Sequence, residues 1–194
     1  MAEQLAWTAP DHVVVPIASG SQLTKVAKGF RELYQVGLLD EEPHVRISGA
    51  QAEGCSPVAQ AFASGADFVR PVKPTGIAKS LAIGNPADGG YALEEVRRSG
   101  GAVDAVSDDE IVDAMSLLAR TEGIFAETAG GVTIAVLAKL AASGVVKADE
   151  RVVAYITGNG LKTLDAVAPR CRPTATVAPN LEAFQGAVNV ADWQ

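Results

Sequence analysis

The sequence contains few of the residues that build metal sites and disulfide frameworks. Only two cysteines, Cys55 and Cys171, and two histidines, His12 and His44, occur in 194 residues. They form no CxxC pair and no metal-ligand spacing, so we expect no bound metal, and a disulfide is not needed in a chain of this size. No serine or cysteine forms a recognised nucleophile elbow with either histidine, which argues against a hydrolase triad.

Basic patches and long apolar runs are also missing. Asp and Glu outnumber Lys and Arg by 23 to 16, and the formal charge of −7 is spread along the chain. An acidic chain without a basic patch argues against nucleic acid as a partner. The most apolar window, GGVTIAVLAKLAASGVV, contains Lys139 and is too short to span a membrane, and the N-terminus lacks a signal-peptide pattern. We expect a cytoplasmic protein that binds neither nucleic acid nor membranes.

The sequence does contain an alternation of strand-like and helix-like segments. Apolar and β-branched runs predict buried strands over 12–17, 44–51, 101–107 and 150–158. Helical spacing of apolar residues predicts helices over 22–38, 56–65, 89–101, 107–123 and 130–144, with a further helix near 181–188. In the fourth of these, Ser107 and Glu110 have the spacing of a reciprocal helix cap. The alternation predicts an α/β fold with an open, mostly parallel sheet and helices on both faces.

Two of the predicted strands end in turns that suit a ligand, because ligands of parallel sheets bind at the carboxyl ends of strands. The first turn, ASGSQ at 18–22, combines a glycine for a tight bend with serine hydroxyls and the free N–H groups of a helix start. Such a turn can hold a phosphate, or it can be a plain connection with a serine cap. The nucleotide patterns GxxxxGK[ST] and GxGxxG are absent.

The second turn, TGNG at 157–160, places the hydroxyl of Thr157 just after the last predicted strand. This hydroxyl can face a ligand ring, or the segment can be an ordinary glycine-rich turn. Glu127 precedes the small residues TAGG, where it can serve as a site acid or as a first-turn charge that favours the helix dipole. The stretch 68–90 is apolar but rich in proline and glycine, and long irregular segments of this kind usually serve or cover a site.

Five blocks of the sequence, taken in order, resemble threonine synthase, a pyridoxal-phosphate enzyme with the fold of the tryptophan synthase β-subunit. They are VVVPIASGSQLTKVAKGFREL, RISGAQAEGCSPVAQAF, KPTGIAKSLAIGNPADG, EGIFAETAGGVTIAVLAKL and YITGNGLK. The resemblance covers about residues 3–165, and KPTGIAKSLAIGNPADG is its most specific block. It implies that residues 1–165 are the large-domain half of that fold and that residues 166–194 are an extension packed on it.

The resemblance also implies where the cofactor pyridoxal phosphate is held. The family's phosphate loop corresponds to Ala18, Ser19, Gly20, Ser21, Gln22 and Leu23. Thr157 corresponds to a threonine whose hydroxyl faces the pyridine nitrogen, and the segment 74–90 corresponds to a part that packs beside the active-site cleft. The intact family converts O-phosphohomoserine and water into threonine and phosphate, which implies a phosphorylated amino acid as substrate.

The chain departs from the family in one important respect, because the Schiff-base lysine motif that precedes the phosphate loop is absent. None of its lysines has that context: Lys25, Lys28, Lys73, Lys79, Lys139, Lys147 and Lys162. That lysine anchors the cofactor and moves protons on the substrate. We therefore expect no catalytic residue in this chain, weak or absent binding of the cofactor, and no activity when the chain is alone.

These expectations describe the C-terminal half of a threonine-synthase-like lyase, either a fragment or one part of a split enzyme. Its expected partners are a missing N-terminal half and further copies of itself in a homo-oligomer. Two alternatives stay open. The chain can be a stand-alone phosphate-binding or small-ligand-binding module or a partner subunit without catalysis. It can also be half of a related enzyme, such as threonine dehydratase or cysteate synthase.

Overall fold

The computed structural model describes residues 1–171 and 175–187. The chain divides into two compact units, Met1–Thr163 and Leu164–Gln194. The second unit contains two short helices, α6 (Leu164–Val167) and α7 (Leu181–Ala187). The predicted extension 166–194 includes residues 172–174 and 188–194, which lie outside the described residues. Its packing on the first unit therefore stays a prediction.

The first unit is built on a sheet of four parallel strands in the order β3-β2-β1-β4. The strands are β1 (His12–Pro16), β2 (Arg46–Ala52), β3 (Val103–Val106) and β4 (Val152–Ala154). The predicted α/β fold with a parallel sheet is confirmed. The last strand is shorter than predicted because, beyond Tyr155, the chain turns toward Glu127, whose N–H donates to the carbonyl of Gly158 at 2.9 Å.

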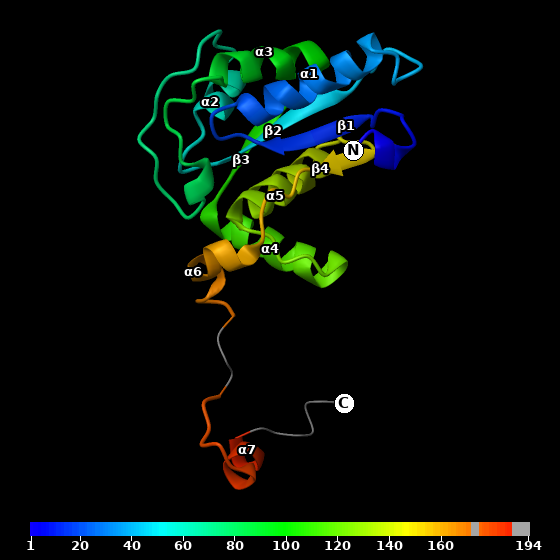
Figure 1. The fold of residues 1–194 in the computed structure, drawn as a ribbon. Helices are drawn as coiled ribbons and strands as arrows, with labels where there is room; N and C mark the ends of the chain where they lie inside the picture. The colour runs from blue at the N-terminus through cyan, green and yellow to red at the C-terminus, as the bar shows by residue number, and fades with distance from the viewer. Residues whose placement is uncertain (172–174, 188–194) are drawn as a thin grey trace. The chain divides into compact units, whose positions relative to one another are not determined.

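Helices cover both faces of this sheet (Figure 1). One face carries α1 (Ser21–Gln35), α2 (Pro57–Ser64) and α3 (Gly89–Ser99), and the other carries α4 (Asp108–Glu122) and α5 (Thr128–Ala142). The capping pattern predicted for α4 is confirmed, since Ser107 and Glu110 bond reciprocally. Three short 3-10 helices, Glu3–Leu5, Lys79–Leu81 and Gly160–Thr163, complete the unit. Among the described residues, no helix combines the length and apolar character needed to cross a membrane.

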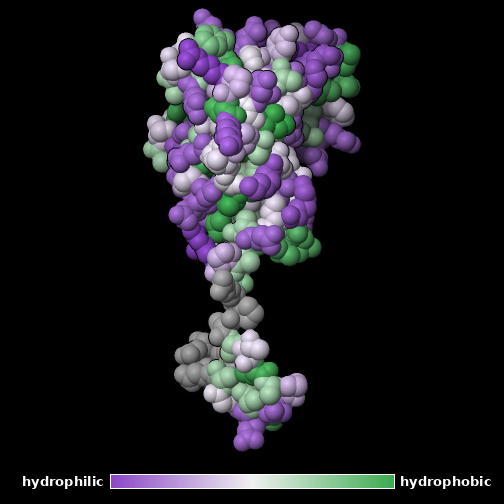
Figure 2. Space-filling model, turned by 90° about the vertical axis from the view of Figure 1, so that its left-hand side faces the viewer, coloured by the Kyte–Doolittle hydropathy of each residue, from purple (hydrophilic) through white to green (hydrophobic). Residues whose placement is uncertain are grey.

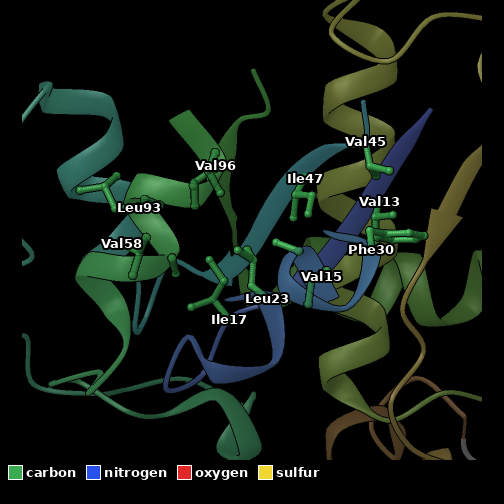
Figure 3. Close-up of a cluster of buried hydrophobic side chains, with 14 of the residues drawn as sticks. Val13, Val15, Ile17, Leu23, Phe30, Val45, Ile47, Val58, Leu93 and Val96 are labelled. Atoms are coloured by element: carbon green, nitrogen blue, oxygen red, sulfur yellow. The ribbon is translucent and has the colours of Figure 1, made fainter. Parts of the chain in front are cut away.

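The main hydrophobic core lies between the sheet and helices α1, α2 and α3. Figure 3 shows branched side chains of β1 and β2 meeting those of the three helices. Alternate residues of β1, such as Val13 and Val15, enter this core, as expected from the two-residue period of a strand. Leu23 and Phe30 from α1 pack against them. The carboxyl end of β1 and the start of α1 are thereby anchored in the core.

A buried polar cluster lies at the opposite edge, where the strands begin. His12 is fully buried, its Nε2 lies 2.7 Å from the hydroxyl oxygen of Ser48, and its Nδ1 lies 3.8 Å from Glu150. Arg46, the register partner of His12, forms an ion pair with Glu150. Burial and the nearby Arg46 lower the pKa of His12, and Glu150 opposes this shift only in part. The folded protein therefore favours the neutral imidazole.

This cluster predicts that the protein loses stability as the solution becomes acidic. The folded-state pKa of His12 lies below its ordinary value of 6.5. Its stabilising contribution is therefore complete above pH 6.5 and is lost as the pH falls from there through the folded-state pKa, by at most about 1.4 kcal/mol per pH unit. Urea unfolding between pH 7.5 and 5.5 measures the effect. In His12→Gln the unfolding free energy should depend less on pH, whereas His44→Gln, at an exposed histidine, should keep the pH dependence of the unaltered chain. A steep dependence in both variants would contradict the assignment.

Candidate functional site

The two turns selected from the sequence meet at the carboxyl edge of the sheet. The chain leaves β1 toward β2 on one side, while β4 pairs with β1 on the other, so the strand order reverses at β1. Ligands of parallel sheets bind in the crevice at such a point. A hollow of about 160 Å³ lies there. Its lining combines Ala18, Ser19, Gly20 and Gln22 from the first turn with Thr157, Glu127, Ser80 and Leu81.

The first turn forms an anion-binding geometry at the start of α1. Gly20 has a φ of +94°, a left-handed conformation that glycine adopts without strain, and it sits directly before the helix. The first helical hydrogen bond runs from the N–H of Thr24 to the carbonyl of Gly20, at 3.2 Å. Within the part of the chain that the structure describes, the N–H groups of Gln22 and Leu23 donate no hydrogen bond. Such groups carry the positive end of the helix dipole and attract anions.

Asp88, at the end of the irregular segment, lies directly against this turn. The hydroxyl of Ser21 donates to the Asp88 carboxylate. The N–H of Asp88 donates to the carbonyl of Ser19 at 2.8 Å. A Cβ added to Gly20 would lie 2.6 Å from the carbonyl oxygen of Asp88, which shows how closely the two backbones approach. The segment therefore packs on the turn, with a carboxylate beside it.

The second turn is tied to a buried carboxylate. Glu127, only 3% exposed, stands at the start of α5. The hydroxyl of Thr157 donates to its Oε1 at 3.1 Å, and the Nζ of Lys162 lies 2.6 Å from its Oε2. Gly158 leaves room for this group, since a Cβ there would lie 2.4 Å from Oε1. The lysine compensates the buried charge, and the carboxylate fixes the direction of the Thr157 hydroxyl.

The residues predicted to bind the cofactor differ in where they lie relative to the hollow. Five of them line the hollow: Ala18, Ser19, Gly20, Gln22 and Thr157. Ser21 lies beside it with its hydroxyl on Asp88. The side chain of Leu23 is buried in the core, so only its N–H is available to a ligand.

Sequence reasoning did not identify Asp88 or Lys162 as neighbours of the site. Asp88 is 67 residues from Ser21, and Lys162 is exposed and far along the chain from the first turn. The irregular composition of residues 68–90 and the family resemblance of residues 74–90 both indicated that this segment lies near a site, but neither identified Asp88 within it. Figure 2 looks onto the side of the molecule that carries this segment, where hydrophobic residues are scattered among hydrophilic ones.

Comparisons with known proteins identify the family to which the chain is similar. The sequence profile of a family described as "Pyridoxal-phosphate dependent enzyme" matches residues 1–158. A threonine synthase of Methanocaldococcus jannaschii is 43% identical over 167 residues, covering 86% of this chain and 41% of that protein. A threonine synthase of Methanosarcina acetivorans is 38% identical over 189 residues, covering 97% of this chain and 46% of that protein. The chain spans less than half the length of these relatives.

Solved structures share the fold at lower identity. A fungal L-serine ammonia-lyase from Rhizomucor miehei superposes with a TM-score of 0.66 at 20% identity, covering 87% of this chain and 52% of that one. The processed form of threonine deaminase isoform 2 from Solanum lycopersicum gives a TM-score of 0.65 at 20% identity, covering 87% and 46%. At this identity the comparison establishes the architecture alone.

Proposed function

The chain belongs to the pyridoxal-phosphate dependent enzyme family, and we propose that it forms one half of a threonine-synthase-like lyase. One observation carries the proposal: the two turns that resemble the family's phosphate loop and ring-nitrogen partner line the same hollow. The sequence identity of 38–43% to threonine synthases supports this choice over threonine dehydratase. The threonine deaminase structure shares only the fold with this chain. The complete enzyme would convert O-phosphohomoserine and water into threonine and phosphate.

The residues of the hollow fit the cofactor's phosphate and ring. The N–H groups of Gln22 and Leu23 and the hydroxyl of Ser19 would receive the phosphate, because they lie at the positive end of α1. The hydroxyl of Thr157, held by Glu127, would face the ring nitrogen. When bound, pyridoxal phosphate supplies an electron sink for carbanion chemistry. The residues of this chain would bind and orient that group.

A second polypeptide segment completes the site in this proposal. The anchoring lysine motif is absent from the sequence, and the relatives are more than twice as long as the matched region. We propose that the lysine belongs to an N-terminal half, either on a separate chain or on a longer form of this one. We also propose a cytoplasmic, homo-oligomeric enzyme, in keeping with a role in amino-acid biosynthesis.

The chain alone should neither anchor the cofactor covalently nor turn over substrate. After incubation with pyridoxal phosphate and reduction with borohydride, mass spectrometry should find no lysine modified in preference to the others. Phosphate release from O-phosphohomoserine should stay at background. The lysine-bearing half of the Methanocaldococcus jannaschii threonine synthase, when added, should raise phosphate release above that of either half alone.

Lys162 provides the sharpest way to contradict this prediction. Its Nζ is engaged with Glu127 and lies near the hollow, so it is the lysine to examine first for an adduct. Selective reduction onto Lys162, together with turnover by the chain alone, would show that the site is complete without a second half. Lys28, an exposed lysine on α1 that pairs with Glu32, serves as the reference for non-specific modification.

A second candidate function is a phosphate-binding module without catalysis. Two observations favour it. Among the described residues, the N–H groups of Gln22 and Leu23 beside the hollow donate no hydrogen bond, and the sequence lacks the anchoring lysine motif. This function would be favoured over half of a lyase if the chain bound phosphate esters but the added lysine-bearing half did not restore turnover.

A further inference from the structure

We propose that Asp88 restrains the phosphate loop: its carboxylate holds the Ser21 hydroxyl and keeps a negative charge beside the loop, which weakens the binding of phosphate dianions. The inference rests on the proposed function, because it takes the turn at 18–22 as the cofactor's phosphate loop. It assigns to Asp88 a role in setting the affinity of that loop. The contact that carries it is the hydrogen bond from the Ser21 hydroxyl to the Asp88 carboxylate.

The position of Asp88 shows that this contact replaces a more usual one. Asp88 is the N-cap residue of α3, where an aspartate typically accepts a bond from an N–H of the first turn. Its side chain makes no such cap bond. The carboxylate is directed instead to Ser21, on a different helix. The side chain therefore serves the loop and leaves its own helix uncapped.

The backbone holds the carboxylate in this place. The N–H of Asp88 donates to Ser19, and the Asp88 carbonyl lies so close to Gly20 that even one added methyl group would collide with it. The segment cannot move away as a rigid body without breaking these contacts. Rotation of the Asp88 or Ser21 side chain can still release the Ser21 hydroxyl while these backbone contacts stay in place.

The charge of Asp88 is also uncompensated, unlike that of the second carboxylate of the site. Glu127 pairs with Lys162, but within residues 1–171 and 175–187 no salt bridge to Asp88 is found. A phosphate bound on the N–H groups of Gln22 and Leu23 would thus meet a neighbouring anion and a hydroxyl already engaged. At an effective dielectric constant near 20, a repulsion of this kind weakens binding by tenfold or more, as an order of magnitude.

Removal of the charge should therefore tighten binding of a phosphate ester to the protein. The probe is pyridoxine 5′-phosphate, which lacks the aldehyde and forms no bond with stray lysines, with inorganic phosphate as a second probe. At pH 8 the ester is a dianion. Isothermal titration should give dissociation constants at least roughly tenfold lower for Asp88→Asn and Asp88→Ala than for the unaltered chain. Amide shifts should map to residues 19–23.

The matched control is Asp40→Asn, which makes the same change in net charge. Asp40 is exposed on the connection between α1 and β2, at the opposite edge of the sheet. The dissociation constant of pyridoxine 5′-phosphate from Asp40→Asn should stay within about twofold of that from the unaltered chain, because exposed charges beyond a Debye length are screened. If the Asp88 variants and the unaltered chain bound the phosphate ester equally well, the role of Asp88 would be overturned, but the proposed phosphate loop would stand. Absence of binding in all of them would overturn both this role and the proposed phosphate loop.

The double variant Asp88→Ala/Ser21→Ala tests the part played by the Ser21 hydroxyl. If Asp88 keeps this hydroxyl from the ligand, Asp88→Ala frees it to bind the phosphate, and adding Ser21→Ala should reverse part of the gain in affinity. A double variant that binds as tightly as Asp88→Ala would contradict the part of the proposal that concerns the Ser21 hydroxyl. Circular dichroism of each variant verifies that it is folded.

Discussion

Replacement of Gly20 with alanine is expected to destabilise the protein by about 2–3 kcal/mol and to abolish phosphate binding. Two effects add at this position. The φ of +94° is one that residues with a Cβ rarely adopt, and the new Cβ would lie 2.6 Å from the backbone oxygen of Asp88. Because that neighbour is backbone, it cannot rotate away, and the turn must shift. Urea unfolding and titration with pyridoxine 5′-phosphate measure the two losses.

Gly29 provides the matched control on the helix that follows the turn. It lies within α1, and a Cβ there would meet nothing within 4 Å. Gly29→Ala should therefore stabilise the protein by roughly 0.5–1 kcal/mol, since alanine is the better helix former. Binding should be unchanged. If the alanine variants at positions 20 and 29 were equally stable, the strain assigned to the loop would be wrong.

Removal of the Gln51 side chain is expected to cost about 2–4 kcal/mol of unfolding free energy. Gln51 is fully buried on β2, and its Oε1 accepts from the N–H of Val58 at 2.9 Å and from that of Ala59 at 3.0 Å. It therefore caps the buried start of α2 from a neighbouring strand. In Gln51→Ala both N–H groups lose their acceptor where water does not reach. Chemical denaturation measures the loss.

Two further variants separate the stability that comes from the hydrogen bonds of Gln51 from the stability that comes from its buried volume. Gln51→Met keeps most of the volume but has no carbonyl oxygen, so it should lose most of the same stability. Gln60→Ala removes an exposed glutamine on α2 and should change stability by less than about 0.5 kcal/mol. A Gln51→Met variant as stable as the unaltered chain would contradict the capping role.

Much of the fold was predictable from the sequence because the patterns are local. Apolar β-branched runs gave the strands, and the pairing of Ser107 with Glu110 marked the start of α4 within a four-residue window. The turns after β1 and β4 were recognisable because parallel strands place their carboxyl ends at one edge. That geometry follows from topology and requires no knowledge of side-chain contacts.

The remaining features depend on contacts between distant residues, which a single sequence does not display. The bond between Ser21 and Asp88 joins residues 67 positions apart, and the aspartate stands where a cap would be the ordinary expectation. The sequence left two roles open for Glu127, and the ion pair with Lys162 depends on how the last strand ends. Gln51 occupied a predicted strand and gave no sign that it caps another element.

The pairing of β1 with β4 has a consequence for how the protein folds. The N–H of Arg151 donates to the Asp11 carboxylate across 140 residues of chain, so this contact closes the longest loop in the sheet. Closure of a long loop costs more conformational entropy than closure of a short one, so we expect this contact to form late in folding. The hollow at the carboxyl ends of β1 and β4 would then be completed after the rest of the sheet. A ligand held there should slow unfolding and proteolysis while leaving the folding rate almost unchanged.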